Sequence, residues 1–145
     1  MFNSYMSMAL MQAEIAFEKG EVPVGAVVVK NGEVVSIAHN LRETNNNAVA
    51  HAEVLAIQKA CDVLGKWRLD ECDIYVTLEP CLMCTGAIIN SRIKSVYFGS
   101  FDRYEGAFET GLDCRKLNST LTIYSGIMED ECNNILQKFF TGIRK

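Results

Sequence analysis

The sequence has little of what marks disordered, fibrous or membrane-embedded chains. Only 2 of its 145 residues are proline and 10 are glycine, which excludes collagen and Pro- or Gly-rich low-complexity segments. No apolar run approaches the roughly 18 residues that a membrane span needs, and stretches such as VGAVVV at 24–29 have the length of a strand. The first residues lack the basic, apolar pattern of a signal peptide, so we expect a cytoplasmic protein without a membrane association.

An excess of positive charge is also missing. The chain has 14 Lys and Arg against 18 Asp and Glu, a net charge of −4, which argues against a nonspecific binder of long nucleic acid but leaves room for a local basic patch. Apolar residues make up 49% of the chain. This length and composition predict one folded domain that spans residues 1–145.

The hydrophobic pattern predicts helices alternating with strands. An amphipathic helix is expected over 3–19, ending near Gly20. The β-branched runs 24–30 and 33–39 flank Asn31-Gly32, a strong signal for an antiparallel hairpin. The remaining elements are a helix over 51–64, a buried strand over 73–78, a helix over 81–90 with Pro80 in its first turn, strands over 95–99 and 121–126, and a helix over 128–140. Five strands with helices enough for both faces predict a three-layer α/β/α sandwich around a five-stranded mixed sheet.

The cysteines point to metal chemistry. Without a secretion signal, the six cysteines at 61, 72, 81, 84, 114 and 132 are expected as thiols or metal ligands. Cys81 and Cys84 lie three residues apart at the start of a predicted helix, where both sulfurs share one side and the thiolate is favoured. With His51 they give three N/S ligands, which leaves water the fourth position of a tetrahedral zinc ion. Iron is an alternative metal, and a redox pair is an alternative use of Cys-x-x-Cys.

Glu53 follows His51 by two residues and is expected at the edge of this metal site. There a carboxylate could take a proton from the bound water and pass it to a leaving group. The ordinary alternative is an acidic residue that stabilises the first turn of a helix. The order His-x-Glu, then Pro-Cys-x-x-Cys, is the signature of zinc deaminases.

The chain also resembles one family, the bacterial tRNA-specific adenosine deaminases of the TadA type, in the cytidine and deoxycytidylate deaminase superfamily. The resemblance runs from about Gly20 to Phe140. It is carried by GEVPVGAVVV from residue 20, AHAE at 50–53, VTLEPCLMCTGAII at 76–89, SRI at 91–93, VYFG at 96–99 and DEC at 130–132. It implies a cytidine deaminase-like fold and a homodimer with one Zn²⁺ per subunit. The implied reaction is hydrolysis of adenosine to inosine at the wobble position of a tRNA anticodon loop.

Matching the family's motifs also implies roles for single residues. Zinc would be held by His51, Cys81 and Cys84, with Glu53 as the proton shuttle. Asn40 would contact the target nucleoside, Ala52 would offer a backbone group to it, and Asp102 would lie beside the nucleic acid. The chain departs from the family pattern at 47–49, which reads Asn-Ala-Val in place of Asp-Pro-Thr, and at 102–106, where Arg103 is a candidate cation for the RNA backbone.

Two other functions remain open at this point. One is a deaminase of a free base or nucleoside such as guanine or cytosine, since the metal motif is shared. The other is a non-catalytic zinc-binding partner subunit. Such a subunit would be expected to lack the proton-shuttling glutamate, which is present here as Glu53.

Overall fold

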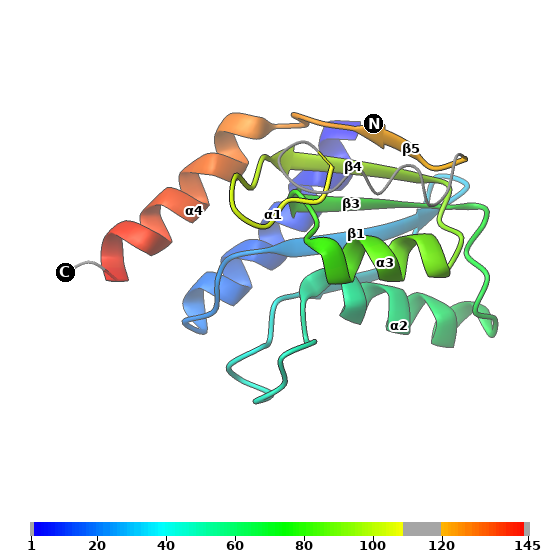
Figure 1. The fold of residues 1–145 in the computed structure, drawn as a ribbon, viewed down its shortest axis with the longest axis horizontal. Helices are drawn as coiled ribbons and strands as arrows, with labels where there is room; N and C mark the ends of the chain where they lie inside the picture. The colour runs from blue at the N-terminus through cyan, green and yellow to red at the C-terminus, as the bar shows by residue number, and fades with distance from the viewer. Residues whose placement is uncertain (1, 109–119, 144–145) are drawn as a thin grey trace.

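The structure is a computed structural model that describes residues 2–108 and 120–143. Figure 1 shows the elements in chain order: α1 (Phe2–Glu18), β1 (Gly25–Lys30), β2 (Glu33–His39), α2 (Ala52–Leu64), β3 (Cys72–Leu78), α3 (Leu82–Asn90), β4 (Ser95–Ser100), β5 (Thr122–Tyr124) and α4 (Glu129–Ile143). Within the described part of the chain, every helix is too short or too polar to cross a membrane.

The five strands form one mixed sheet in the order β2-β1-β3-β4-β5. β1 pairs antiparallel with β2 and β3, whereas β3, β4 and β5 run parallel. The predicted hairpin is confirmed: Asn31 and Gly32 both have positive φ, at 52° and 79°, as a type I′ turn between twisted strands requires.

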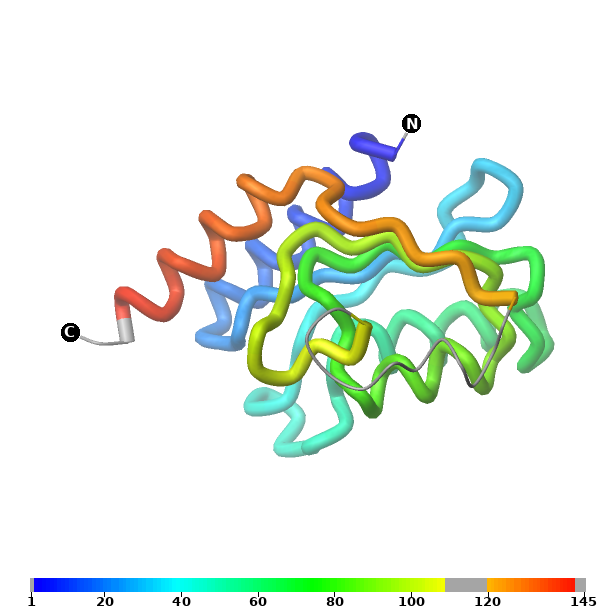
Figure 2. The backbone as a smooth tube through the Cα atoms, turned by 45° about the horizontal axis from the view of Figure 1, so that its top comes forward, coloured from blue at the N-terminus to red at the C-terminus, as the bar shows by residue number. Residues whose placement is uncertain are grey.

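Alternate side chains of the central strands pack in two separate hydrophobic cores, one on each face of the sheet. On β1, Ala26 and Val28 pack in the core that contains α2, whereas Val27 and Val29 pack in the core beneath α1, as the two-residue period of a strand dictates. The two views agree that α1 and α4 cover one face of the sheet and that α2 and α3 cover the other (Figures 1 and 2). The predicted three-layer sandwich is confirmed.

Several predicted boundaries differ from the structure by one to three residues, and three differences matter here, two of them for the site. His51 and Cys81 are not the first residues of helices but N-caps in extended backbone, with ψ of 153° and 176°. Pro80 therefore precedes the N-cap and does not occupy the first turn of α3. Cys81 is extended because its backbone forms an antiparallel bridge with Gly106. The third difference is β5, which spans three residues where six were expected.

Candidate active site

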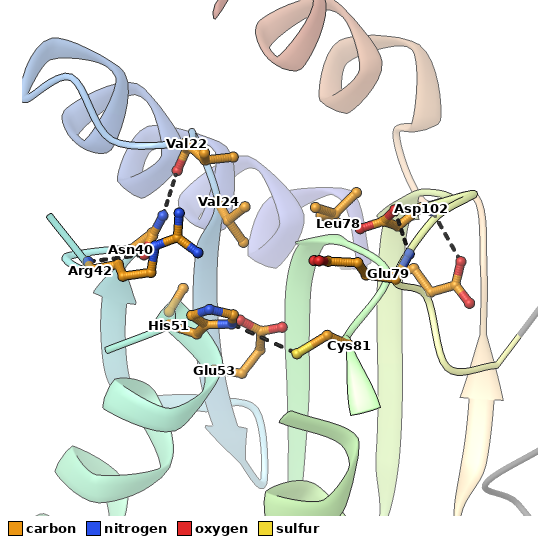
Figure 3. A pocket seen from close by; sticks show the side chains of 12 residues that line it. Val22, Val24, Asn40, Arg42, His51, Glu53, Leu78, Glu79, Cys81 and Asp102 are labelled. Atoms are coloured by element: carbon orange, nitrogen blue, oxygen red, sulfur yellow. Dashed lines mark hydrogen bonds between the residues drawn. The ribbon is translucent and has the colours of Figure 1, made fainter. Parts of the chain in front are cut away.

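A cleft opens at the end of the sheet where β3 and β4 terminate and β1 begins. Its empty space, including the part open to solvent, is about 540 Å³. A position outside the carboxyl ends of parallel strands is usual for the sites of α/β proteins. Five segments supply its walls, and Figure 3 labels most of the residues involved. They are Val22 and Val24 before β1, Asn40 and Arg42 after β2, His51, Ala52 and Glu53 at the start of α2, Leu78, Glu79 and Cys81 from the end of β3 to the start of α3, and Asp102 and Glu105 after β4.

The three predicted metal ligands meet at the floor of this cleft. His51 Nδ1 lies 3.7 Å from Cys81 Sγ and 3.5 Å from Cys84 Sγ, and the three donor atoms all lie within 4.8 Å of one another. Two ligands on one tetrahedral zinc, with Zn–S near 2.3 Å and Zn–N near 2.0–2.1 Å, are separated by about 3.6 Å. The donor set and its spacing therefore fit zinc.

The pKa values of the three candidate ligands are shifted in different directions. Hydrogen bonds from Cys84 and His51 hold the pKa of Cys81 well below its usual value, against the effect of burial. The hydrogen bond to Cys81, together with burial, raises the pKa of Cys84. The hydrogen bond between His51 and Cys81 raises the pKa of His51. A thiolate is thus favoured at Cys81 even before a cation binds, and a divalent metal would replace the shared protons.

Glu53 lies beside this group in the first turn of α2. Its side chain is only 4% exposed, and burial, reinforced by the charge of Cys81, raises its pKa to about 7. Figure 3 shows its carboxyl directed into the space next to His51 and Cys81. A carboxyl with a pKa near 7 can both accept and donate a proton at neutral pH.

Asn40 and Arg42 form one wall of the cleft. The Asn40 amide donates to the Val22 carbonyl at 3.2 Å and its Oδ1 accepts from the Arg42 amide at 3.2 Å, so its side chain is held in one orientation. Arg42 is a basic residue that lines the cleft, whereas Arg103, the candidate cation for the RNA backbone, is not among the residues that line it. Nothing in the Asn-rich segment 41–47 distinguished this arginine in advance.

A buried carboxylate, Glu21, holds the loop that carries Arg42. Glu21 is 1% exposed and accepts hydrogen bonds from the Glu43 amide at 3.0 Å and from both the amide and the hydroxyl of Thr44 at 2.6 Å. Burial alone would raise the pKa of Glu21, but these hydrogen bonds hold it below its usual value. The loop is thus attached to the body of the protein through a charged group.

Ala52 and Asp102 also line the cleft, as their matched positions suggested. Ala52 is fully buried at the start of α2. The Asp102 carboxylate accepts from the Tyr104 amide at 3.0 Å and from the Glu105 amide at 3.1 Å, so it also organises a turn of its own loop. Six of the residues matched to the family's motifs thus line one cleft: Asn40, His51, Ala52, Glu53, Cys81 and Asp102. The seventh, Cys84, is buried next to His51.

A second, more open groove continues from the cleft. It shares Arg42, His51, Cys81 and Glu105 with the cleft and extends over Ala48, Leu82, Met83, Tyr104, Gly106 and Ala107. Tyr104 is 96% exposed and Leu82 57% exposed. An exposed phenol and apolar side chains beside an arginine form a surface on which nucleobases can stack.

A three-layer sandwich with His, Cys and Cys at the starts of two helices, and a glutamate beside them, defines a deaminase of the nucleobase-modifying class. Comparison with known proteins agrees, because the family model of the MafB19-like deaminases matches residues 2–144.

Three similar proteins indicate which family of deaminases this chain resembles most. The tRNA-specific adenosine deaminase of Bacillus subtilis (strain 168) is 48% identical over 144 residues, which cover 97% of this chain and 89% of the relative. A structure from a study of A-to-I editing by tRNA:A34 deaminases is 41% identical, with a TM-score of 0.87, over 91% of this chain and 98% of that chain. The guanine deaminase of Bacillus subtilis is also 41% identical, with a TM-score of 0.65, but over 68% of this chain and 63% of that chain. The chain belongs to the family of tRNA-specific adenosine deaminases.

Proposed function

We propose that this protein converts adenosine to inosine at the wobble position of a tRNA anticodon, with one zinc ion per subunit in a single domain over residues 1–145. The observation that carries the proposal is the grouping of His51, Cys81 and Cys84, with Glu53 beside His51 and Cys81 in the lining of the cleft, in a chain that is 48% identical to a tRNA-specific adenosine deaminase.

In this proposal His51, Cys81 and Cys84 would hold zinc, which would supply Lewis-acid activation of a water molecule. Glu53 accepts a proton from that water as its oxygen forms a bond to C6 of adenine. Glu53 then passes this proton to N1 of the ring. The remaining proton of the new C6 hydroxyl moves through Glu53 to the amino group, so that the C6–N bond breaks with loss of ammonia and the C6–O bond becomes a carbonyl. Water is consumed, adenosine becomes inosine, and Glu53 ends in its starting state.

The walls of the cleft would orient the base during this proton transfer. The Asn40 side chain and the backbone at Ala52 supply polar groups next to Glu53. Val22 and Val24 supply an apolar surface against which a flipped purine can pack. A single-stranded loop favours entry, because its bases leave the stack at lower cost than those of a duplex.

The second groove supports an RNA substrate over a free base. A free purine would need only the cleft, whereas the groove gives room for a neighbouring nucleotide, with Tyr104 as a stacking surface and Arg42 as a cation. Because Arg42 lines both spaces, it can contact a phosphate between the target nucleotide and its neighbour.

The test is inosine formation on an anticodon stem-loop with adenosine at the wobble position. Free adenosine, guanine and cytosine are assayed beside it, with a stem-loop that carries guanosine at that position as the matched control. Inosine from the adenosine stem-loop alone is the expected result. Turnover of a free base with an unreactive stem-loop would refute the tRNA assignment while keeping the deaminase chemistry.

A guanine deaminase is the second candidate, because the guanine deaminase of Bacillus subtilis shares 41% identity with the part of this chain that it matches. That relative aligns with less of the chain than the tRNA-specific enzymes do. The guanine arm of the assay decides between the two. A non-catalytic partner subunit is disfavoured by the presence of Glu53.

We further propose that the protein acts in the cytoplasm and as a homodimer, as the family resemblance implied. The molar mass in solution, measured by light scattering with and without the stem-loop, tests the second point. A monomer that remains fully active would contradict it.

A further inference from the structure

Glu79 is a second buried carboxyl at the cleft, and no step of the proposed reaction uses it. It directly follows β3 and lies two residues before Cys81. Its side chain is 2% exposed. Its Oε1 accepts a hydrogen bond from the Asp102 amide at 3.1 Å, and its Oε2 accepts one from the Phe108 amide at 2.9 Å. One carboxyl thus accepts hydrogen bonds from two amides six positions apart in the 101–108 loop, the described segment that follows β4. Figure 3 shows Glu79 next to Asp102.

The 101–108 loop lies directly against this carboxyl. The Ala107 amide donates to the Pro80 carbonyl at 3.0 Å, and Gly106 bridges Cys81. A Cβ at Gly106 would lie 2.3 Å from the carboxyl carbon of Glu79 and 2.5 Å from the Asp102 carbonyl oxygen. The loop can approach Glu79 this closely only because residue 106 has no side chain.

The same loop supplies one side of the cleft and much of the groove. Asp102 and Glu105 line the cleft, and Tyr104 lines the groove. The Asp102 carboxylate bonds to amides of its own loop, so it shapes the turn from within. Glu79 differs because it joins the loop to the junction between β3 and α3.

We propose that Glu79 is a positioning residue: its buried carboxyl holds the 101–108 loop in place and so fixes the wall of the cleft and groove that receives the RNA. The RNA part of this inference rests on the proposed function. The attachment of the loop does not, so the two can fail separately.

The first test measures the loop without any substrate. Hydrogen–deuterium exchange is followed at the amides of Asp102 and Phe108 in the wild type and in Glu79→Gln, whose side-chain amide can replace only one of the two acceptor oxygens. Exchange at one or both amides should accelerate about tenfold to 100-fold, the equivalent of one lost buried hydrogen bond. The control Glu71→Gln changes an exposed glutamate that is paired with Lys30, and it should leave both amides unchanged.

The second test separates binding from chemistry. In Glu79→Gln the KM for the stem-loop should rise about tenfold, with kcat within about threefold of the wild type and the metal content unchanged. A role in general stability alone would lower the melting temperature and the active fraction but would leave KM unchanged.

Gly106→Ala tests the same contact from the side of the loop. Its added methyl group should displace the loop from Glu79, so KM should rise in this variant too. Because both changes break one contact, the double variant should be little worse than either single variant. Fully additive effects on KM would overturn the proposal.

The wild type alone also gives a decisive result, even where a variant does not fold. If the Asp102 and Phe108 amides exchange at the rate of an unstructured peptide, Glu79 does not hold the loop and the inference is wrong. If the exchange results are as expected but the stem-loop is not a substrate, the loop attachment stands and the proposed function fails.

Discussion

Replacing Glu53 by glutamine removes the proposed proton shuttle with almost no change of shape. The side chain is 4% exposed and its carboxyl is not one of the three donor groups that fit zinc. The variant should therefore fold and bind metal as the wild type does, while it can neither accept nor donate the proton that deamination requires.

The size of the effect follows from the role. General acid–base catalysis by a positioned side chain contributes roughly 10²- to 10⁴-fold, or about 3–5 kcal/mol in the activation free energy. Burial raises the pKa of Glu53 to about 7, which matches the shuttle to neutral pH, and the same group acts in both proton transfers. We therefore expect kcat on the stem-loop to fall at least about 100-fold, with KM nearly unchanged.

The assay is single-turnover inosine formation, with zinc content measured on the same preparation. Glu71→Gln is the matched control, because its side chain is 61% exposed and lies 3.4 Å from Lys30 in an ion pair. If Glu53→Gln kept more than about a tenth of the wild-type rate, Glu53 would not be the proton shuttle, since a shuttle contributes far more than tenfold. Loss of zinc from the variant would show instead that Glu53 supports the metal site.

Three other predictions test the loops and the packing of the fold. Gly25→Ala should lower the free energy of unfolding by about 2–3 kcal/mol, measured by urea denaturation, because the new Cβ would lie 1.9 Å from the Ala9 carbonyl oxygen; an unchanged midpoint would contradict this packing. Glu21→Gln should lower the melting temperature at neutral pH, because hydrogen bonds from Thr44 hold the pKa of Glu21 below its usual value. The difference between variant and wild type should close as the pH falls through this lowered pKa, since protonation removes the advantage of the carboxylate; a difference that persists in strong acid would argue against it. Tyr104→Ala should raise the KM for the stem-loop by about tenfold, a typical value for one stacked base, and Tyr104→Phe should not; equal effects of the two would assign the role to the hydroxyl.

The parts of the fold that could be predicted from the sequence depend on local patterns. The Asn31-Gly32 turn signals a hairpin because its residues tolerate positive φ, and the strands flanking it show the β-branched runs that a sheet favours. The three metal ligands could also be predicted from the sequence, because His51 lies close to the start of one helix and Cys81 close to the start of the next. Two such helix starts at one end of a sheet bring distant ligands together.

The start of α3 could not be predicted correctly from local sequence patterns. Proline suits the first turn of a helix, so Pro80 predicted a helix from residue 81. Cys81 is extended instead, because it pairs with Gly106, 25 positions further along the chain. A contact of that kind depends on how a later loop folds back, and no pattern within residues 78–85 reports it.

The residues that sequence reasoning missed share one physical feature. Glu21 and Glu79 are almost fully buried carboxyls that accept backbone amide hydrogen bonds from loops far away in the sequence. In the sequence each resembles an ordinary surface glutamate, because the partners are amides that any residue can supply. Arg42 gains its position in the cleft wall through the loop that Glu21 holds.

The two buried carboxyls divide the site into parts with different origins. The metal ligands and Glu53 lie at the starts of α2 and α3, where packing on the sheet holds them. The flanking walls, at Arg42 on one side and Asp102 on the other, belong to loops attached through Glu21 and Glu79. Substitutions at the helix starts should therefore abolish the chemistry, whereas substitutions at the two carboxyls should change which substrate is held and how tightly. Changes of substrate within this fold would then arise most easily in the loops 41–47 and 101–108, the regions that contain Arg42 and Tyr104.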